Sequence, residues 1–284
     1  MNFNQKLISW LFETDALRVC PENKPFFYTS GTIGPYYINT HFLYGSEASA
    51  NALLKKIDSQ LEGGKTVSAS IAAETEAHYK AGGVYRELMD GIAEVITREV
   101  GTENFDYISG GERRDWFFSF TAAQLLGKPH ITIFKDKSCE IYYPVDALNP
   151  EIEGARVLHI SDLITEASSY DRAWIPAIEE LGAKMPLSLS VVDRLQGGRE
   201  LLQGHGARQI SLIEVGKELF DEALAIGKIT KDQYDMIIAY IKDPTAAMEA
   251  FLKDNPEFLQ NALNSDERTR ARAELLLSSG VYKI

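Results

Sequence analysis

Residues 156–170 have the sequence RVLHISDLITEASSY, and this stretch gives the strongest indication of the fold. The apolar run 156–160 predicts a buried β-strand, because it is short, rich in branched side chains and followed by small polar residues. A loop over 161–169 comes next, and the sequence then becomes helical to about Leu181. A strand, a short loop and a helix in this order are typical of an α/β protein.

The loop that follows this strand carries groups suited to binding a phosphate. Backbone N–H groups at a helix N-terminus attract anions, and the hydroxyls of Thr165, Ser168 and Ser169 add further donors. Asp162, at the end of the strand, is placed to hold ribose hydroxyls or a Mg²⁺ ion. The alternative is that Asp162 and the serines only cap the helix, which is a common role of these residue types.

Strands and helices continue to alternate on both sides of this stretch. Further apolar strands are predicted at 107–109, 130–134 and 186–192. The alternation predicts an α/β fold with a parallel sheet flanked by helices. In such sheets ligands bind beyond the carboxyl ends of the strands. The loops 110–115 and 193–199 are therefore candidate site loops, together with 161–169.

The first part of the chain predicts one helix and an aromatic hairpin. Apolar residues at helical spacing favour a helix over 4–17, with Asn4 as its N-cap. The aromatic runs 26–29 and 36–39 have high strand propensity, and the Gly and Pro residues of 30–35 between them suit a turn. We expect the two runs to form a hairpin-like excursion.

More helices are predicted before and after the sheet. Ser46 opens a helix to about residue 61, which Gly63–Gly64 end, and 66–100 contains one or two helices interrupted at Gly82–Gly83. After Ile213 the sequence predicts only short amphipathic helices, at 221–227, 230–241, 244–252, 256–263 and 266–277. We expect this tail to pack on the sheet domain.

Composition excludes several classes of protein. The chain has 284 residues, 29 Lys and Arg against 41 Asp and Glu, and a formal net charge of −12, which argues against a nucleic acid partner. No apolar run approaches the ~20 residues that cross a bilayer, and the first residues lack the pattern of a signal peptide, so we expect no membrane association and a cytoplasmic location. Cys20 and Cys139 lie far apart in segments of different kinds, which predicts free thiols.

The stretch 156–170 resembles the phosphoribosyl pyrophosphate (PRPP) motif of type I phosphoribosyltransferases. Three further segments are similar to the orotate phosphoribosyltransferase branch of that family: FYTSGTIGPYYIN at 27–39, ISGGERR at 108–114 and VDRLQGG at 192–198. The four segments follow one another in the order found in the family.

The resemblance implies a fold, a division of the chain and an activity. It implies a phosphoribosyltransferase-like domain over 1–213, with a hood segment at about 20–45 and a helical insertion at about 66–100, and a helical C-terminal extension over 214–284. The activity it implies is transfer of phosphoribosyl from PRPP to orotate or a related base in pyrimidine biosynthesis, with release of pyrophosphate. It also implies Mg²⁺ as cofactor and a homodimer as the assembly.

The resemblance assigns roles to individual residues. It implies PRPP contacts for Thr165, Ser168, Ser169, Gly110, Gly111, Arg113 and Arg114, catalytic roles for Asp162, Lys135 and Lys137, and contacts to the base for Ser30, Tyr36, Tyr37 and Arg194. A guanidinium such as that of Arg194 suits the orotate carboxylate, with which it can form bidentate hydrogen bonds.

Considered without the resemblance, the same residues have plainer alternatives. In this alternative, Arg194 forms a salt bridge with a local acid such as Asp193. Arg113 and Arg114 are a solvated pair, and the aromatic residues belong to the core. His159, in the middle of an apolar strand, is expected to be a packed core histidine.

The sequence departs from the family pattern at positions that matter for catalysis. Ser161 stands where the family has the first of two adjacent acids, and Glu166 and Ala167 replace residues of its phosphate loop. A carboxylate facing the phosphate would weaken binding, and replacing a Gly restricts close approach of the backbone. The run 134–143 contains Lys135 and Lys137 but lacks the Lys-x-His-Gly stretch of the family's mobile catalytic loop.

Two hypotheses follow. One is an active orotate phosphoribosyltransferase-like enzyme, in which cations and Mg²⁺ neutralise the departing pyrophosphate. The other is a catalytically inactive protein of the same fold that binds a nucleotide or a pyrimidine and acts as a regulator or scaffold.

Overall fold

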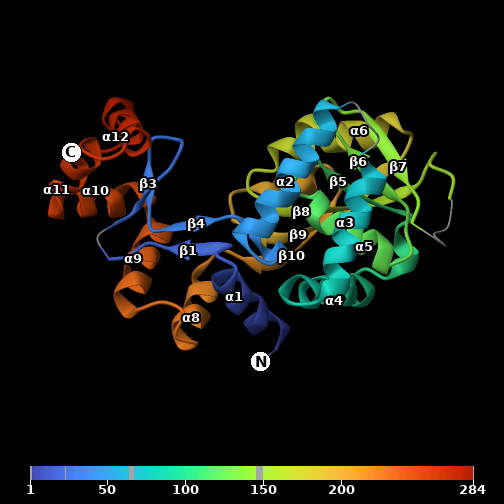
Figure 1. The fold of residues 1–284 in the computed structure, drawn as a ribbon, viewed down its shortest axis with the longest axis horizontal. Coiled ribbons are helices and arrows are strands. Elements are labelled where there is room, and N and C mark those ends of the chain that lie inside the picture. Colours follow the sequence, from blue (N-terminus) through green and yellow to red (C-terminus); the bar gives the residue numbers. More distant parts are fainter. Residues whose placement is uncertain (1, 23, 64–66, 145–149, 284) are drawn as a thin grey trace. The chain divides into compact units, whose positions relative to one another are not determined.

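A computed structural model describes residues 2–22, 24–63, 67–144 and 150–283. The chain forms two compact units, each built from two segments (Figure 1). The first unit combines Met1–Thr14 with Thr40–Val215, and the second combines Asp15–Asn39 with Gly216–Ile284. Each unit is described by itself.

The first unit is built on one mixed sheet, which confirms the predicted α/β class. Its strands are β5 (Tyr107–Gly111), β6 (His130–Ile133), β7 (Cys139–Tyr142), β8 (Arg156–Ile164), β9 (Lys184–Asp193) and β10 (Arg208–Glu214). Their order in the sheet is β10-β9-β8-β5-β6-β7. Every neighbouring pair is parallel except β6 and β7, which are antiparallel.

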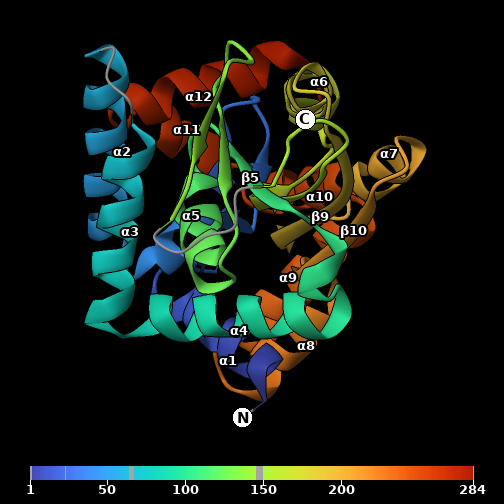
Figure 2. The ribbon, with the colours of Figure 1, turned by 90° about the vertical axis from the view of Figure 1, so that its right-hand side faces the viewer.

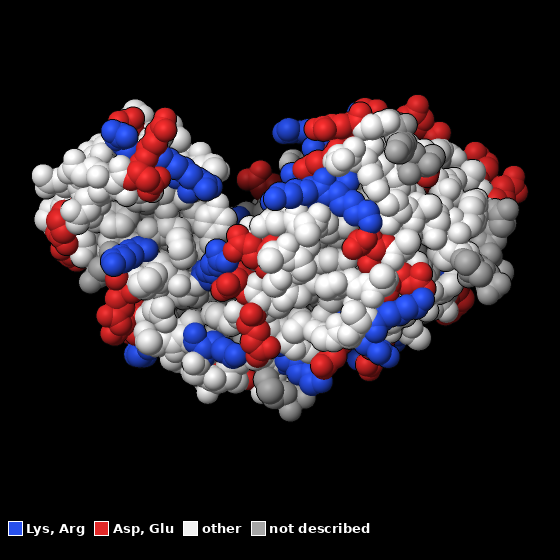
Figure 3. Space-filling view, viewed as in Figure 1, with Lys and Arg blue, Asp and Glu red and all other residues white. Residues whose placement is uncertain are grey.

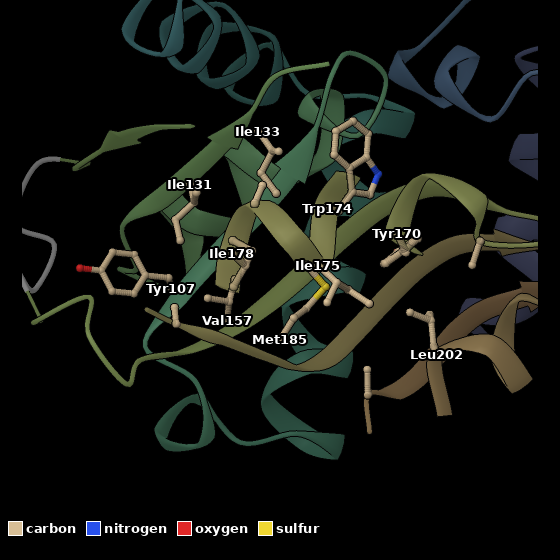
Figure 4. Close-up of a cluster of buried hydrophobic side chains, with 14 of the residues drawn as sticks. Tyr107, Ile131, Ile133, Val157, Tyr170, Trp174, Ile175, Ile178, Met185 and Leu202 are labelled. Atoms are coloured by element: carbon tan, nitrogen blue, oxygen red, sulfur yellow. The ribbon is translucent and has the colours of Figure 1, made fainter. Parts of the chain in front are cut away.

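Helices cover both faces of this sheet because its strands present apolar side chains alternately to each face. On one face, Ile131 and Ile133 of β6 belong to a core cluster with Ile175 and Ile178 (Figure 4). These last two residues come from the helix α6 (Ile175–Glu180), which continues the π-helical segment η3 (Tyr170–Trp174). His130, on the other face of β6, stacks on Phe120 of α5 (Trp116–Leu125), with ring centroids 3.9 Å apart.

Further helices complete the first unit (Figure 2). They are α1 (Phe3–Glu13), η1 (Thr40–Tyr44), α2 (Glu47–Glu62), α3 (Ser68–Ala81), α4 (Val84–Glu99), η2 (Thr102–Asn104) and α7 (Gly198–Gly204). The predicted N-cap Asn4 was wrong, because Asn2 caps α1 in a capping box with Gln5. Ser46 caps α2 as predicted. Gly82 and Gly83, both with positive φ, separate α3 from α4.

Part of the predicted helix boundaries cannot be compared. Gly64, named as part of the stop of the helix opened by Ser46, and Thr66, named as the start of the insertion, lie outside the described residues.

The second unit pairs its aromatic strands differently from the predicted hairpin. Strand β2 (Phe26–Phe27) pairs with β3 (Ile33–Gly34), and β4 (Tyr36–Ile38) pairs with β1 (Leu17–Val19), both antiparallel. The predicted helix 4–17 therefore ends earlier, since Leu17 already belongs to a strand. The tail forms α8 (Lys217–Ala225), α9 (Lys231–Lys242), α10 (Pro244–Asp254), α11 (Glu257–Leu263) and α12 (Glu267–Ser279).

These tail helices share a core with the aromatic strands. Ile33 of β3 lies in a buried cluster with Met248, Leu252 and Leu276, and Tyr282 closes it. The structure therefore groups residues 15–39 with the tail, whereas the sequence analysis placed the hood with the sheet and expected the tail to pack there.

Three smaller expectations have an outcome. His159 is fully buried in β8, as predicted for a core histidine. Cys20 and Cys139 are free thiols. Among the helices that the described residues form, none combines the length and apolar character that crossing a bilayer requires.

Candidate functional site

A pocket of about 320 Å³ lies in the first unit, at the loops that follow β5 and β8. It is lined by Glu112, Arg113, Arg114, Asp115, Lys135, Ser161, Asp162, Leu163, Ile164, Thr165, Ala167, Ser168, Ser169, Tyr170 and Trp174. Two of the three loops predicted from topology, 110–115 and 161–169, contribute to it. This is the carboxyl end of the parallel strands, where α/β sheets bind ligands.

The phosphate-loop candidates Thr165, Ser168 and Ser169 line this pocket together. The loop is shorter than predicted, because β8 continues to Ile164 and so includes Ser161 and Asp162. The turn occurs at Ala167, which has a φ of 54°, the left-handed conformation that Gly adopts most easily. The Ala167 side chain is buried in the core cluster beneath the loop. The loop therefore keeps a glycine-like backbone.

Glu166 does not face the pocket, contrary to the expectation of a carboxylate opposed to phosphate. Its side chain is exposed, and it is absent from the described residues that line the cavity. Within this turn, the Ala167 side chain is buried and the Glu166 side chain is exposed.

Ser161, which stands in place of an acid, is held by a hydroxyl network. The Tyr170 hydroxyl donates to Ser161 Oγ at 3.0 Å and lies 2.8 Å from Ser188 Oγ. Both Ser161 and Tyr170 are almost fully buried. A neutral chain of hydroxyls therefore occupies this part of the site.

A second carboxylate lies beside Asp162 although the acidic pair is missing from the sequence. Asp115 Oδ1 accepts the backbone N–H of Asp162 at 3.0 Å, and Asp115 Oδ2 accepts that of Gly111 at 3.0 Å. Both acids are 8% exposed. Burial, followed by repulsion from Asp115, raises the pKa of Asp162 well above its ordinary value, while Arg114 opposes the shift.

His159 supports this corner from within the sheet. Its Nδ1 lies 2.9 Å from Ser109 Oγ, and its Nε2 lies 3.4 Å from Asp115 Oδ2. This last contact is too poorly directed to count as a hydrogen bond, and Nε2 has no hydrogen-bond partner within the described part of the chain. The His159 ring therefore lies next to Asp115 without a hydrogen bond between them.

Two of the cations at the pocket are already paired with carboxylates. The Arg113 guanidinium forms an ion pair with Asp58 of α2. Lys135 Nζ lies 3.3 Å from Glu112 Oε1, and the backbone N–H of Lys135 donates to Glu112 Oε2 at 3.1 Å. Arg114 is exposed and lies near enough to Asp162 and His41 to affect the pKa of both. The predicted alternative, a solvated Arg113–Arg114 pair, does not describe Arg113.

The run 134–143 contains the turn and the second strand of a β-hairpin. Strands β6 and β7 pair in antiparallel fashion, and Phe134 N–H donates to Ser138 O at 2.9 Å across the turn. Lys135 reaches the pocket, whereas Lys137 is exposed and is absent from its described lining. The structure thus brings together one of the two predicted catalytic lysines with Asp162.

Gly110 and Gly111 have packing roles. A Cβ on Gly110 would lie 2.2 Å from Ser119 Oγ, and one on Gly111 would lie 2.3 Å from the Trp174 ring. Both glycines are buried in β5, and the described pocket lining does not include them. They allow α5 and Trp174 to approach the strand.

The residues expected at the base are distributed over both units. Ser30, Tyr36 and Tyr37 belong to the second unit, where the Tyr36 ring packs on Phe220 and Tyr240 with centroids 5.3 and 5.8 Å apart. Ser30 is exposed, and its Oγ lies 2.8 Å from Thr32 Oγ1. The Tyr37 ring contacts Phe26 and Tyr28.

Arg194 belongs to the first unit, directly after β9, and is half-buried. The alternative that it pairs with Asp193 is wrong, because Asp193 Oδ2 lies 3.3 Å from Arg199 instead. Asp193 Oδ1 accepts the backbone N–H of Leu195 at 2.8 Å, which orders the loop around Arg194.

Three residues at or beside the pocket were not predicted from the sequence: Asp115, Trp174 and Asp58, the partner of Arg113. Asp115 lay within a candidate loop, so its position after β5 was a usable signal. Asp58 lies on a helix that precedes the sheet, and Trp174 lies one turn beyond the phosphate loop. Only the fold brings Trp174 to the pocket and Asp58 to Arg113 at its edge.

The acids of the pocket suit Mg²⁺ only in the company of a phosphorylated ligand. Among the described residues, no group of three or more His, Cys, Asp or Glu side chains is arranged to hold a metal ion. Asp115 uses both oxygens on backbone N–H groups, so Asp162 is the carboxylate that would hold a metal ion. Mg²⁺ commonly takes one or two carboxylates and completes its shell with substrate phosphates and water.

Comparisons with known proteins find chains of similar sequence. No protein-family model matches the chain. An orotate phosphoribosyltransferase of Ruegeria sp. (strain TM1040) is 28% identical over 165 residues, which is 57% of this chain and 72% of that protein. Another, of Rhizobium meliloti (strain 1021), is 37% identical over 102 residues, or 34% of this chain and only 40% of that protein.

The fold has a matching solved structure. The orotate phosphoribosyltransferase from Aeropyrum pernix superposes with a TM-score of 0.51 and 19% identity, over 78% of this chain and 99% of that one. The chain is therefore similar in sequence to orotate phosphoribosyltransferases and has the type I phosphoribosyltransferase fold.

Proposed function

We propose that the chain binds PRPP in the pocket after β5 and β8 and transfers its phosphoribosyl group to orotate or a related base. The observation that carries this proposal is the loop Thr165–Ser169, which presents three hydroxyls to the cavity and turns Glu166 away. In the reaction a base nitrogen forms a bond to ribose C1 while the bond from C1 to a pyrophosphate oxygen breaks.

Each part of the pocket has a proposed role. Thr165, Ser168 and Ser169 donate hydrogen bonds to the 5-phosphate, and Asp162 faces the ribose hydroxyls. Arg114 and Lys135 face the pyrophosphate. Arg194 of the first unit, outside the described pocket lining, is proposed to contact the base. The base contacts expected of Ser30, Tyr36 and Tyr37, which belong to the second unit, stay a prediction. A Mg²⁺ ion held by Asp162 and the ligand would neutralise charge on the leaving group. A homodimer and a cytoplasmic location belong to the same proposal.

The second candidate is a catalytically inactive protein that binds a nucleotide at the same loop. It is favoured by the ion pairs of Arg113 with Asp58 and of Lys135 with Glu112, which occupy cations that the leaving group needs. In this case phosphoribosyl transfer does not occur, although the loop Thr165–Ser169 still binds the phosphate of a nucleotide.

Calorimetric titration with PRPP, with and without Mg²⁺, tests the proposal. Thr165→Ala and Ser168→Ala should each weaken binding about tenfold, because a hydrogen bond to a charged group contributes about 1.5–3 kcal/mol. Thr97→Ala, which removes a hydroxyl from α4 outside the pocket, is the matched control. Absence of PRPP binding by the wild type in both conditions would contradict the proposal.

A pyrophosphate-release assay with orotate and other bases then separates the two candidates. Turnover supports the enzyme. Binding of PRPP without turnover on any base of the panel supports the inactive binder.

A further inference from the structure

The groups that line the pocket differ sharply between its two ends. The loop Thr165–Ser169 offers neutral hydroxyl donors, whereas the β5 loop and the β6–β7 turn contribute the charged residues Glu112, Arg113, Arg114 and Lys135. Charges of both signs also lie next to one another on the face of this unit seen in Figure 3. The residues of this charged end therefore determine whether the pocket can bind a second phosphate group.

Arg113 is held by a residue from outside the sheet. Asp58, on the fourth turn of α2, forms an ion pair with it, and the two side chains are 48% and 32% exposed. Neither side chain is deeply buried, so the pair can exchange partners. A phosphate that recruits Arg113 must displace Asp58 and then lies close to a carboxylate that has lost its partner.

Lys135 is held in a similar way by Glu112. The Glu112 side chain is only 10% exposed, and its two oxygens contact the ammonium and the backbone N–H of Lys135. This carboxylate is fixed at the pocket wall, whereas the Lys135 side chain is 71% exposed. An anion placed beside Lys135 therefore also meets the charge of Glu112.

Arg114 is the remaining cation of the pocket. Of the described residues that line the cavity, it is the only Lys or Arg that forms no ion pair with a carboxylate within 4.0 Å. One available guanidinium together with the hydroxyl loop suits a single phosphate group, which carries about two negative charges near neutral pH.

We propose that Asp58 and Glu112 compete with a diphosphate for Arg113 and Lys135, so that the pocket binds pentose monophosphates, such as a nucleoside monophosphate, in preference to PRPP. This inference rests on the proposed phosphoribosyl site and names its preferred ligand class. Asp58 and Glu112 are specificity-determining residues, since they act through the cations that they hold.

The test compares ribose 5-phosphate with PRPP by calorimetry at one fixed Mg²⁺ concentration and low salt. The wild type should bind ribose 5-phosphate more tightly than PRPP. Asp58→Asn and Glu112→Gln keep the shape of each side chain and remove its charge. Each should tighten PRPP binding up to about fivefold, because an exposed ion pair contributes up to about 1 kcal/mol. Ribose 5-phosphate affinity should change by less than about twofold in each.

Two variants outside the pocket control for net charge. Asp90→Asn and Glu94→Gln remove acids that pair with Arg86 and Arg98 on α4. They should leave the ratio of the two affinities unchanged. Thermal unfolding of all four variants shows whether each is folded, and the two pocket variants test the inference separately.

The outcomes separate this inference from the proposed function. Tighter binding of PRPP than of ribose 5-phosphate by the wild type overturns the inference and leaves the proposed function standing. A ratio that neither pocket variant shifts relative to the controls also overturns it. If no protein of the set binds either ligand, the proposed function fails, and the inference fails with it.

Discussion

Asp115 and Asp162 place two carboxyl groups in one buried corner of the pocket. Asp115 is tied to two backbone N–H groups, one from β5 and one from β8. Its charge and the burial of the site favour the protonated form of Asp162. A ligand or metal that needs ionised Asp162 must therefore overcome this preference, and its binding should strengthen as the pH rises.

Asp162→Asn should stabilise the protein, and the gain should grow with pH. The pKa of Asp162 is raised in the folded state, so the folded protein holds a proton that the unfolded chain releases above about pH 4. Wild-type stability from this group is present at low pH and is lost as the pH rises, while Asn carries no such dependence. Urea unfolding should show a gain on the order of 2 kcal/mol at about pH 8 and little at about pH 4. A destabilised variant at about pH 8 would contradict this account.

Ala167 shows how the loop 165–169 adopts a glycine-like backbone without a glycine. Ala167→Gly relieves the left-handed conformation but loses a buried methyl group and raises the entropy of the unfolded chain. These effects oppose one another, so the free energy of unfolding should stay within about 1 kcal/mol of wild type. Ala167→Val should lose about 2 kcal/mol or more, because a β-branched residue is strained at positive φ. Denaturant titration checks both, and equal effects of the two changes would refute the argument.

At the scale of the element, β6 links the core to the charged end of the pocket. His130 on this strand lies 2.8 Å from Ser119 Oγ and 3.0 Å from Thr132 Oγ1, and it is fully buried. The strand then turns through Lys135 into β7, so the position of that lysine depends on the pairing of β6 with β7. The hairpin therefore limits how far Lys135 can move toward a ligand.

Buried histidines on β6 and in η1 should make the fold acid-sensitive. Burial lowers the pKa of His130 to about 3, helped by His159, and burial lowers that of His41 to about 3, helped by Arg114 and Arg113. Their stabilising effect is complete above about pH 6.5 and is lost as the pH falls toward about 3, since the unfolded chain takes up these protons first. Each should remove about 2 kcal/mol between about pH 7 and about pH 5. His130→Gln should reduce the pH slope of unfolding by about one proton, and an unchanged slope would contradict this.

At the scale of the whole molecule, the second unit combines a segment near the N-terminus with the C-terminal helices. Residues 15–39 lie in one unit with the helices that follow residue 215. The Arg272 guanidinium donates to Phe27 O at 2.9 Å, and Phe27 stacks on Phe258 with centroids 5.1 Å apart. The aromatic segment therefore depends on the C-terminal helices for its structure.

Tyr282→Phe should weaken this second unit. The Tyr282 hydroxyl accepts the N–H of Ile33 at 3.1 Å and donates to its carbonyl at 3.4 Å, both in a buried setting. Leaving the Ile33 N–H without a partner should cost about 1–3 kcal/mol and speed hydrogen exchange at that amide. Tyr79→Phe, which removes a surface hydrogen bond to Asp90, should change stability by less than about 0.5 kcal/mol. Unaltered exchange at Ile33 in the Tyr282 variant would refute the role of this contact.

The sequence by itself determined the alternation of strands and helices, the cap at Ser46, the helical tail and the hydroxyl loop at the end of β8. These features depend on periodicity, caps and residues a few positions apart, which a local pattern specifies. It predicted the pairing of the aromatic runs wrongly, because strands of two or three residues carry too little pattern to specify a partner.

Only the tertiary structure decided the chemistry of the pocket. It placed Asp115 beside Asp162, 47 positions away, and Asp58 against Arg113, 55 positions away, and it turned Glu166 out to solvent. Which side chains meet across such separations depends on how β5, β8 and α2 pack together, and that packing is the product of the whole core. The electrostatic potential at a site is the sum of contributions from charges that are close in space. The sequence therefore does not determine that potential until the fold is known.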